Sequence, residues 1–199
     1  MTEISAALVK ELRDKTGSGI MDCKQALKEN NGDLEKALDF LRKKGLASAQ
    51  KRSGRDAKEG VVQSYIHMGG KIGVMVEVNC ETDFVAKNED FQEFAKNVAM
   101  HIAAAAPMGL GPEEIPESVI AREREIYRER ALEQGKPANI IDKIVDGQVE
   151  KFYKDSCLMS QPYIKDPKLT ITDLLTETIA KIGENIKIRR FARFQVGGE

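Results

Sequence analysis

The sequence predicts an α+β fold, in which a small N-terminal module of three helices precedes a core with a three-stranded antiparallel sheet packed by helices. Three patterns support this prediction. Helical periodicity fills the first 54 residues, two alternating runs flank Gly69-Gly70, and a third alternating run closes the chain at 186–196. Alternation of apolar and polar residues is typical of a half-buried strand, whereas spacings of three and four residues are typical of a helix with one buried stripe.

The N-terminal module is expected to span residues 1–54. Its first helix should end at the glycines of Thr16–Gly19, because glycine tolerates the left-handed turn that stops a helix. Asp33 is expected to cap the third helix. A module of this size buries little apolar area, so we expect a docking domain rather than a catalytic pocket.

A basic stretch follows the apolar stripe of the third helix. Between Arg42 and Lys58 there are seven basic residues and a single acid, Asp56. We interpret this stretch as a solvated helix end and a linker to the next domain. Contact with RNA or with an acidic partner is the alternative, although no aromatic residue is interleaved to stack on bases.

Gly69-Gly70 predicts a β-hairpin with His67 at its tip, because two adjacent glycines between alternating runs suit a tight turn. The second run places Ile72, Val74, Val76 and Val78 on one buried face. His67 has no second histidine or acidic cluster at ligand spacing, so a metal site is not expected here.

The segment Glu77–Asn88 joins this strand to a helix with an apolar stripe over residues 91–102. It is polar apart from Phe84 and Val85. Phe84 either packs into the core or projects as an anchor for a partner, and the composition alone favours the core, because apolar residues usually serve folding. Glu81 lies four residues after Glu77, but no pocket is evident around this pair of carboxylates.

Two helical stretches joined by Gly135-Lys136-Pro137 predict an antiparallel helical hairpin over residues 117–156. Its thin apolar seam and charged flanks indicate a protruding arm. Thr172 is then expected to cap a last helix. Together with the hairpin and the closing strand, these elements form a core domain over residues 55–199.

In the closing strand, strict alternation would put Phe194 on the same face as Ile188 and Phe191 on the opposite face. Phe191 is therefore a candidate for a second buried surface. A sheet of three strands also leaves two open edges, which proteins usually cover or pair.

Composition excludes several classes of protein. The net charge is −1 with 32% charged residues, so no global field steers the chain to nucleic acid or to a membrane surface. Cys23, Cys80 and Cys157 are odd in number and far apart, which is typical of a reducing cytosol rather than of a disulfide or zinc framework. We find no phosphate-binding glycine loop and no nucleophile–base constellation. The residues thus indicate a binding protein without catalytic residues, metal or cofactor.

Two long motifs resemble the signatures of the bacterial translation elongation factor Ts family. One is LRDKTGSGIMDCKQAL at 12–27, and the other is EVNCETDFVAKN at 77–88. The similarity continues through the arm to KIGENIKIRR at 181–190, so it covers essentially the whole chain.

The resemblance implies a cytoplasmic translation elongation factor that is not an enzyme. Such a guanine-nucleotide exchange factor binds elongation factor Tu·GDP and promotes GDP release by disturbing the Mg²⁺ and phosphate site. The N-terminal module then resembles the family's UBA-like (ubiquitin-associated) docking domain. The resemblance assigns disturbance of the Mg²⁺ site to the turn formed by Thr82, Asp83, Phe84 and Val85, which reverses the core interpretation of Phe84. It assigns partner docking to Leu12, Arg13, Ile20, Met21 and His67.

Longer family members carry two related halves of the core, whereas this chain supplies one sheet. The resemblance to the short form implies a homodimer, in agreement with the open sheet edges and with Phe191. Neither nucleic acid nor membrane is implied as a direct partner. The alternative function is an RNA-binding or ubiquitin-type adaptor without exchange activity, but neither explains the Thr-Asp-Phe turn.

Overall fold

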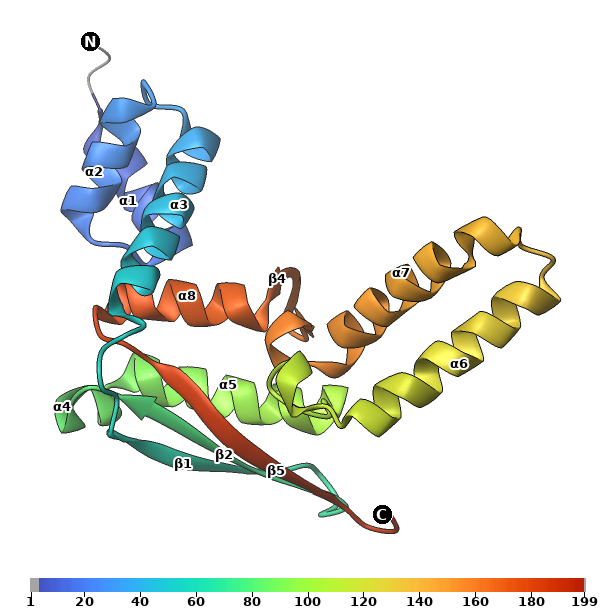
Figure 1. Cartoon of the computed structure of the whole chain (residues 1–199). Helices are drawn as coiled ribbons and strands as arrows, with labels where there is room; N and C mark the ends of the chain where they lie inside the picture. Colours follow the sequence, from blue (N-terminus) through green and yellow to red (C-terminus); the bar gives the residue numbers. More distant parts are fainter. Residues whose placement is uncertain (1–3, 199) are drawn as a thin grey trace. The chain divides into compact units, whose positions relative to one another are not determined.

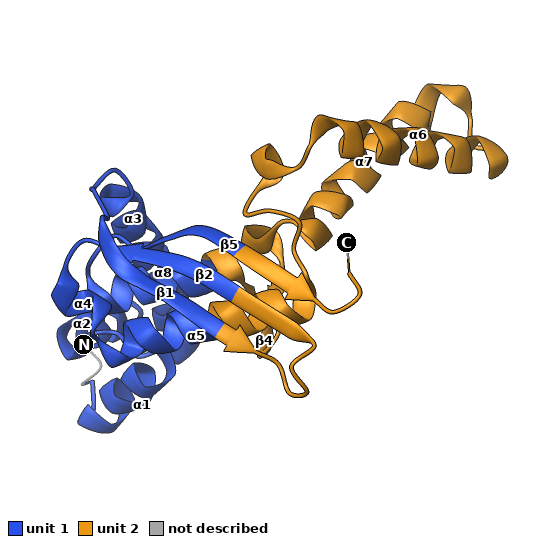
Figure 2. Ribbon diagram, turned by 90° about the horizontal axis from the view of Figure 1, so that it is seen from below, with its two compact units in different colours: residues 1–64, 75–97, 173–191 blue, residues 65–74, 98–172, 192–199 orange. Residues whose placement is uncertain are grey.

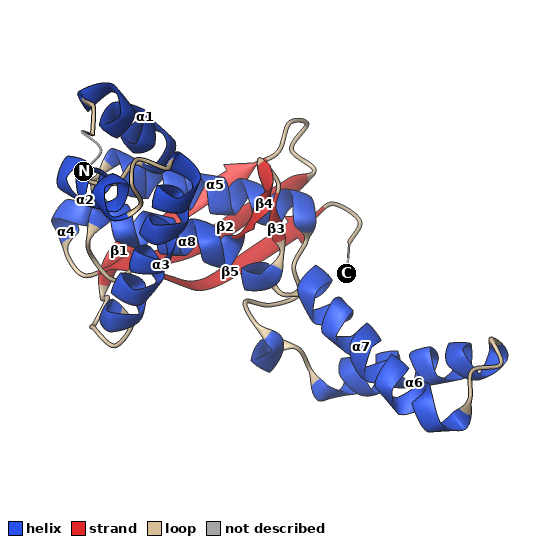
Figure 3. Ribbon diagram, turned by 90° about the horizontal axis from the view of Figure 1, so that it is seen from above, coloured by secondary structure: helices blue, strands red, loops and turns tan. Residues whose placement is uncertain are grey.

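The computed structural model describes residues 4–198 and shows an α+β chain with two compact units (Figures 1 and 2). The first unit contains the chain up to residue 64 with 75–97 and 173–191, and the second contains 65–74, 98–172 and the chain from 192. Figure 3 distinguishes helices (blue) from strands (red) by colour. A three-stranded antiparallel sheet in the order β1-β2-β5 is formed by β1 (Glu59–Ile66), β2 (Ile72–Cys80) and β5 (Lys187–Gln195). The predicted fold class is confirmed.

Three helices begin the first unit, namely α1 (Ala6–Thr16), α2 (Ile20–Glu29) and α3 (Leu34–Arg52). Gly17 ends α1 in the left-handed region with φ 64°, and the Asp33 side chain caps α3 by accepting the N–H of Lys36 at 3.1 Å. Both features agree with the sequence-based predictions. The helices enclose one apolar cluster, made of Val9, Leu12, Cys23, Ala26, Leu27, Ala37 and Leu41.

Helix α3 is longer than its apolar stripe suggested, because it continues through most of the basic stretch to Arg52. Gly45 is buried where α3 meets α8 (Ile171–Ile182), and a Cβ atom at Gly45 would lie 3.3 Å from that of Ala180. Arg42 also pairs with Asp173 of α8 at 2.8 Å. Residues 42–52 therefore belong to the end of α3, and the linker part of the basic stretch is confined to residues 53–58.

In the rest of the first unit, the predicted strand and helix faces are confirmed. Val76 and Val78 of β2 are fully buried, whereas Met75 is half exposed. Phe91 and Phe94 of α5 (Glu89–Ala105) are also buried. The polar segment between these two buried faces is thereby anchored at both ends.

The second unit contains the predicted helical hairpin, formed by α6 (Glu117–Glu133) and α7 (Ala138–Ser156). The pair has its own apolar cluster, made of Ala131, Ile141, Val145 and Val149. Arg124 pairs with Asp146 and Arg128 pairs with Asp142, each at 2.6 Å between nitrogen and oxygen. The predicted apolar seam with charged flanks is confirmed.

Several short elements of the second unit were not predicted. They are a two-stranded sheet of β3 (Pro162–Tyr163) and β4 (Asp166–Thr170), with the 3-10 turns η1 (Pro112–Glu114) and η2 (Leu158–Ser160). The expected cap at Thr172 is wrong. Helix α8 begins at Ile171, so Thr172 lies inside it, and the Thr172 hydroxyl donates to the carbonyl oxygen of Met159 at 2.7 Å.

Strand β5 also departs from strict alternation. Arg189 and Arg190 are both exposed although they are consecutive, so exposure does not alternate along this part of the strand. Phe194 is 65% exposed, whereas the Arg193 guanidinium turns inward and donates to the carbonyl oxygen of Ala103 at 3.2 Å. Phe194 is therefore not part of the buried apolar set to which Ile188 belongs.

Candidate functional site

The 82–85 turn follows strand β2 after one intervening residue, Glu81, and contains the first residues of the one-turn helix α4 (Asp83–Ala86). Thr82 has extended backbone and caps this helix, because its hydroxyl oxygen accepts the N–H of Val85 at 3.4 Å. The carbonyl oxygen of Thr82 accepts the N–H of Ala86 at 3.2 Å, and Ala86 is buried. The sequence Thr-Asp-Phe-Val-Ala thus folds into a short turn with a polar start and a buried end.

Phe84 is 81% exposed at the outer side of this turn, so it does not pack in the core of the described chain. Asp83 is exposed beside it, and its carboxylate accepts a hydrogen bond from the Lys87 ammonium at 2.8 Å. That hydrogen bond holds the pKa of Asp83 below its ordinary value. The turn therefore presents a large aromatic side chain next to a carboxylate that is ionised at neutral pH.

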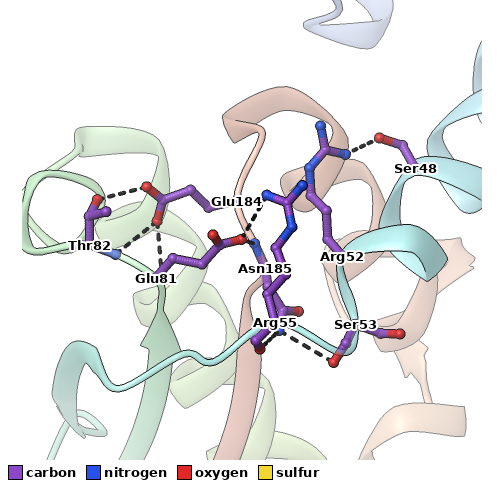
Figure 4. Close-up of polar contacts among 8 residues, drawn as sticks. All are labelled: Ser48, Arg52, Ser53, Arg55, Glu81, Thr82, Glu184 and Asn185. Carbon is purple, nitrogen blue, oxygen red and sulfur yellow. Dashed lines mark hydrogen bonds and ion pairs between the residues drawn. The ribbon is translucent and has the colours of Figure 1, made fainter.

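A hydrogen-bond network supports the turn from within the first unit (Figure 4). The Glu184 carboxylate accepts the Thr82 hydroxyl at 2.7 Å and the backbone N–H groups of Glu81 and Thr82 at 3.1 Å each. Glu81 in turn accepts the N–H of Asn185 at 2.6 Å and pairs with Arg55 at 3.4 Å. This role of Glu184 was not predicted from the sequence. Glu184 entered the predictions only as part of segment 181–190, which resembles the family.

Glu77, Glu81 and His101 each have hydrogen-bond or ion-pair partners of their own. Glu77 pairs with Arg190 at 2.7 Å, and this contact lowers the pKa of Glu77, so Glu77 and Glu81 have separate partners. His101 is fully buried and hydrogen-bonded to Gln161 at 3.0 Å. Within residues 4–198 there is no group of three or more His, Cys, Asp or Glu side chains that could hold a metal ion.

The predicted docking residues of the helical module divide into two groups. Arg13, Ile20 and Met21 are exposed, with exposed fractions of 54% for Ile20 and 74% for Met21. Leu12 has no exposed surface and lies in the apolar cluster of the module. The expectation that Leu12 touches a partner is therefore corrected: on the amphipathic helix α1, Leu12 occupies the inner face and supports its exposed neighbours.

Arg13 and Ile20 also line a groove of about 500 Å³ between α1 and α2. Four of its lining side chains are apolar, and the charged ones are three basic and one acidic. The lining residues are Ile4, Ala6, Val9, Lys10, Arg13, Asp14, Ile20 and Lys24. The module can thus contact a partner through both apolar area and positive charge.

His67 lies in the second unit, at the exposed tip of the β1–β2 hairpin. Its backbone N–H donates to the carbonyl oxygen of Ile72 at 2.9 Å, which confirms the predicted hairpin. The ring Nδ1 lies 3.2 Å from the Tyr65 hydroxyl. His67 is therefore held in an accessible position by its own hairpin.

Comparisons with known proteins decide the family. A sequence model of the family described as elongation factor TS matches residues 45–179. The chain is 65% identical over 197 residues to elongation factor Ts of Desulfosudis oleivorans, covering 99% of this chain and 100% of that protein. The chain belongs to the elongation factor Ts family.

Other elongation factor Ts proteins are similarly close. The protein of Carboxydothermus hydrogenoformans is 60% identical over 194 residues, with 98% of this chain and 89% of that protein covered. The protein of Citrifermentans bemidjiense is 64% identical, with 98% of this chain and 90% of that protein covered. These alignments include the helical module, which the family model leaves largely outside its match.

Membership in the elongation factor Ts family makes the chain a translation elongation factor, and guanine-nucleotide exchange is the function of that family. In the part of the chain that the structure describes, no helix is long and apolar enough to cross a membrane.

Proposed function

We propose that this elongation factor Ts binds elongation factor Tu·GDP and releases GDP through protein–protein binding alone, without covalent chemistry. The observation that carries the proposal is the 81% exposure of Phe84 on a turn that is fixed by hydrogen bonds. An exposed aromatic side chain on a rigid support is well suited to fill a pocket of a partner, because aromatic anchors dominate binding energy at interfaces.

The proposed mechanism is displacement of the groups that support Mg²⁺ in the nucleotide site of elongation factor Tu. Mg²⁺ requires near-ideal octahedral coordination, so a small shift of its supports weakens the binding of the phosphates. Asp83 adds a negative charge beside Phe84, and this charge repels the phosphates of GDP. Because coupling between two binding sites is reciprocal, GDP also weakens the binding of the exchange factor.

Arg13, Ile20 and Met21 are proposed to dock the helical module, here interpreted as a UBA-like domain over residues 1–54, on the nucleotide domain of the same partner. Docking provides affinity for elongation factor Tu, whereas the 82–85 turn displaces the groups that support Mg²⁺. The two parts should therefore affect different kinetic quantities.

A homodimer is proposed because apolar side chains remain exposed on the strands and just after β5. Val62 and Met75 in the first unit are 67% and 50% exposed, and Ile66, Phe194 and Val196 in the second unit are 66%, 65% and 72% exposed. A second copy of the chain would cover them. Light scattering should give about twice the chain mass of 22.1 kDa, and a mass of one chain would contradict the dimer.

The adaptor alternative loses support from the basic stretch. Four of its seven basic side chains already pair with acids, namely Arg42 with Asp173, Lys44 with Asp22, Arg55 with Glu81 and Lys58 with Asp56. Direct binding to nucleic acid is therefore not part of the proposal. The proposed location is the cytoplasm, where translation takes place.

The deciding experiment measures release of a fluorescent GDP analogue from elongation factor Tu. Nanomolar to micromolar additions of the protein should accelerate release, and excess GDP should dissociate the complex of the two proteins. No acceleration by the intact chain would refute the proposed function. Salt-dependent retention of RNA instead would support the adaptor alternative.

A further inference from the structure

We propose that Glu184 is a positioning residue for nucleotide exchange, which holds the 82–85 turn in the orientation that aims Phe84 at the partner. The inference rests on the proposed function of Phe84. Glu184 is half-buried, and both of its carboxylate oxygens bond to residues 81 and 82, so its proposed role is to act through the turn.

The contacts of Glu184 converge on the start of the turn. One carboxylate oxygen accepts the backbone N–H groups of Glu81 and Thr82 at 3.1 Å each, and the other accepts the Thr82 hydroxyl at 2.7 Å. Residues 81 and 82 come just after β2 ends at Cys80. Glu184 therefore satisfies backbone donors at the point where the chain leaves the strand, through charge-assisted hydrogen bonds.

Thr82 transmits this restraint to α4. Its hydroxyl donates to Glu184 and accepts the N–H of Val85 at 3.4 Å, so one oxygen atom joins the carboxylate to the first turn of the helix. Phe84 lies within that turn and is 81% exposed. Because little of its side chain is packed, the direction of Phe84 depends on the backbone of the turn and hence on Glu184.

Glu184 is itself held in place. It follows Gly183, which ends α8 with φ 88°, a backbone conformation that favours glycine. The next residue, Asn185, is buried and donates its side-chain N–H to the carbonyl oxygen of Arg55 at 2.7 Å (Figure 4). The carboxylate thus extends from a restrained segment toward the turn.

The test compares Glu184→Gln with the matched carboxylate-to-amide variant Asp146→Asn, which removes an ion pair in the helical hairpin. Glutamine keeps the size of the side chain but loses the charge and one acceptor oxygen. The first measurement is backbone amide hydrogen exchange at Glu81 and Thr82 in the full-length free protein, which requires no partner. The second is GDP release from elongation factor Tu at increasing factor concentration, which separates the maximal rate from the half-saturating concentration.

We expect the amides of Glu81 and Thr82 to exchange about tenfold faster in Glu184→Gln, and the maximal rate of GDP release to fall by about tenfold, as for loss of one charge-assisted hydrogen bond. The half-saturating concentration should change little, because the docking residues are untouched. Asp146→Asn should match the unmodified protein in both measurements. A purely structural role would instead lower the melting temperature without changing the maximal rate, and this result would overturn the inference.

Thr82 variants keep the test informative if Glu184→Gln fails to fold. Thr82→Val removes the shared hydroxyl and should lower the maximal rate, whereas Thr82→Ser keeps the hydroxyl and should retain it. Phe84→Ala in the same assay separates the two proposals. If Phe84→Ala is fully active, the proposed function of the turn fails. If Phe84→Ala is impaired while Glu184→Gln and Thr82→Val are normal, only the positioning role fails.

Discussion

Replacement of Phe84 by alanine should impair nucleotide exchange severely while leaving the stability of the free protein almost unchanged. Phe84 is 81% exposed, so about one fifth of its side chain is buried. That fraction corresponds to roughly 40 Å² and to a loss of roughly 1 kcal/mol of unfolding free energy. For a chain of this length, the melting temperature should fall by no more than about 4 °C.

Loss of an aromatic anchor at an interface commonly costs about 2 kcal/mol or more. This cost lowers the population of the complex that releases GDP by about thirtyfold. The assay is stopped-flow release of a fluorescent GDP analogue from elongation factor Tu, with thermal unfolding measured on the same samples. Phe91→Ala serves as the stability control. Phe91 is fully buried, so its truncation should cost about 3–5 kcal/mol and lower the melting temperature by roughly 10 °C.

Leu132→Ala is the exposure control, because Leu132 is 57% exposed on the helical hairpin and should affect neither measurement. A Phe84→Ala variant that lost as much stability as Phe91→Ala, and still released GDP at the normal rate, would contradict the proposed role. That outcome would place Phe84 in the core and leave the 82–85 turn without a part in exchange.

Three further predictions concern docking, pH and the dimer. Met21→Asp should raise the half-saturating concentration about tenfold or more without lowering the maximal rate, and a lower maximal rate at saturation would show that docking and displacement are not separate. Burial lowers the pKa of His101 in the folded state. The stability contributed by neutral His101 is therefore present above its unfolded pKa of about 6.5 and is lost as pH falls through the folded pKa. Thermal unfolding between about pH 8 and 5 should show this loss of stability, and His101→Gln should make the loss smaller. In the proposed dimer, one subunit would present His67 and the other would present Phe84 to the same partner. If so, mixing the inactive variants His67→Ala and Phe84→Ala under conditions where subunits exchange should restore part of the GDP-release activity. No recovery, despite demonstrated exchange of subunits, would mean that each chain works alone.

Local patterns are sufficient for much of the fold. Asp33 at a cap, Gly17 at a helix end and the alternation of β2 depend on neighbouring residues, so the sequence predicts them directly. The helical hairpin also follows from its own periodicity. Predictions fail where distant segments decide: Thr172 bonds to Met159 instead of capping a helix, and α3 continues to Arg52 through the region where Arg42 and Gly45 contact α8.

Motif similarity likewise indicates the family and the 82–85 turn directly, since both signatures are long and contiguous. It does not separate Leu12, which is buried, from Ile20 and Met21, which are exposed. The three lie in one motif, but exposure depends on how α1, α2 and α3 pack.

The class of fold, the helical hairpin and the identity of the aromatic residue at the turn are all encoded in local sequence patterns. The outward projection of Phe84 is not, and neither is the contact of Glu184 with Thr82, a residue 102 positions earlier in the chain. The physical reason is that periodicity reports which face of an element is apolar, whereas a hydrogen bond between distant segments depends on where folding brings their backbones. The orientation of the turn is set by such a bond, and no local pattern encodes it.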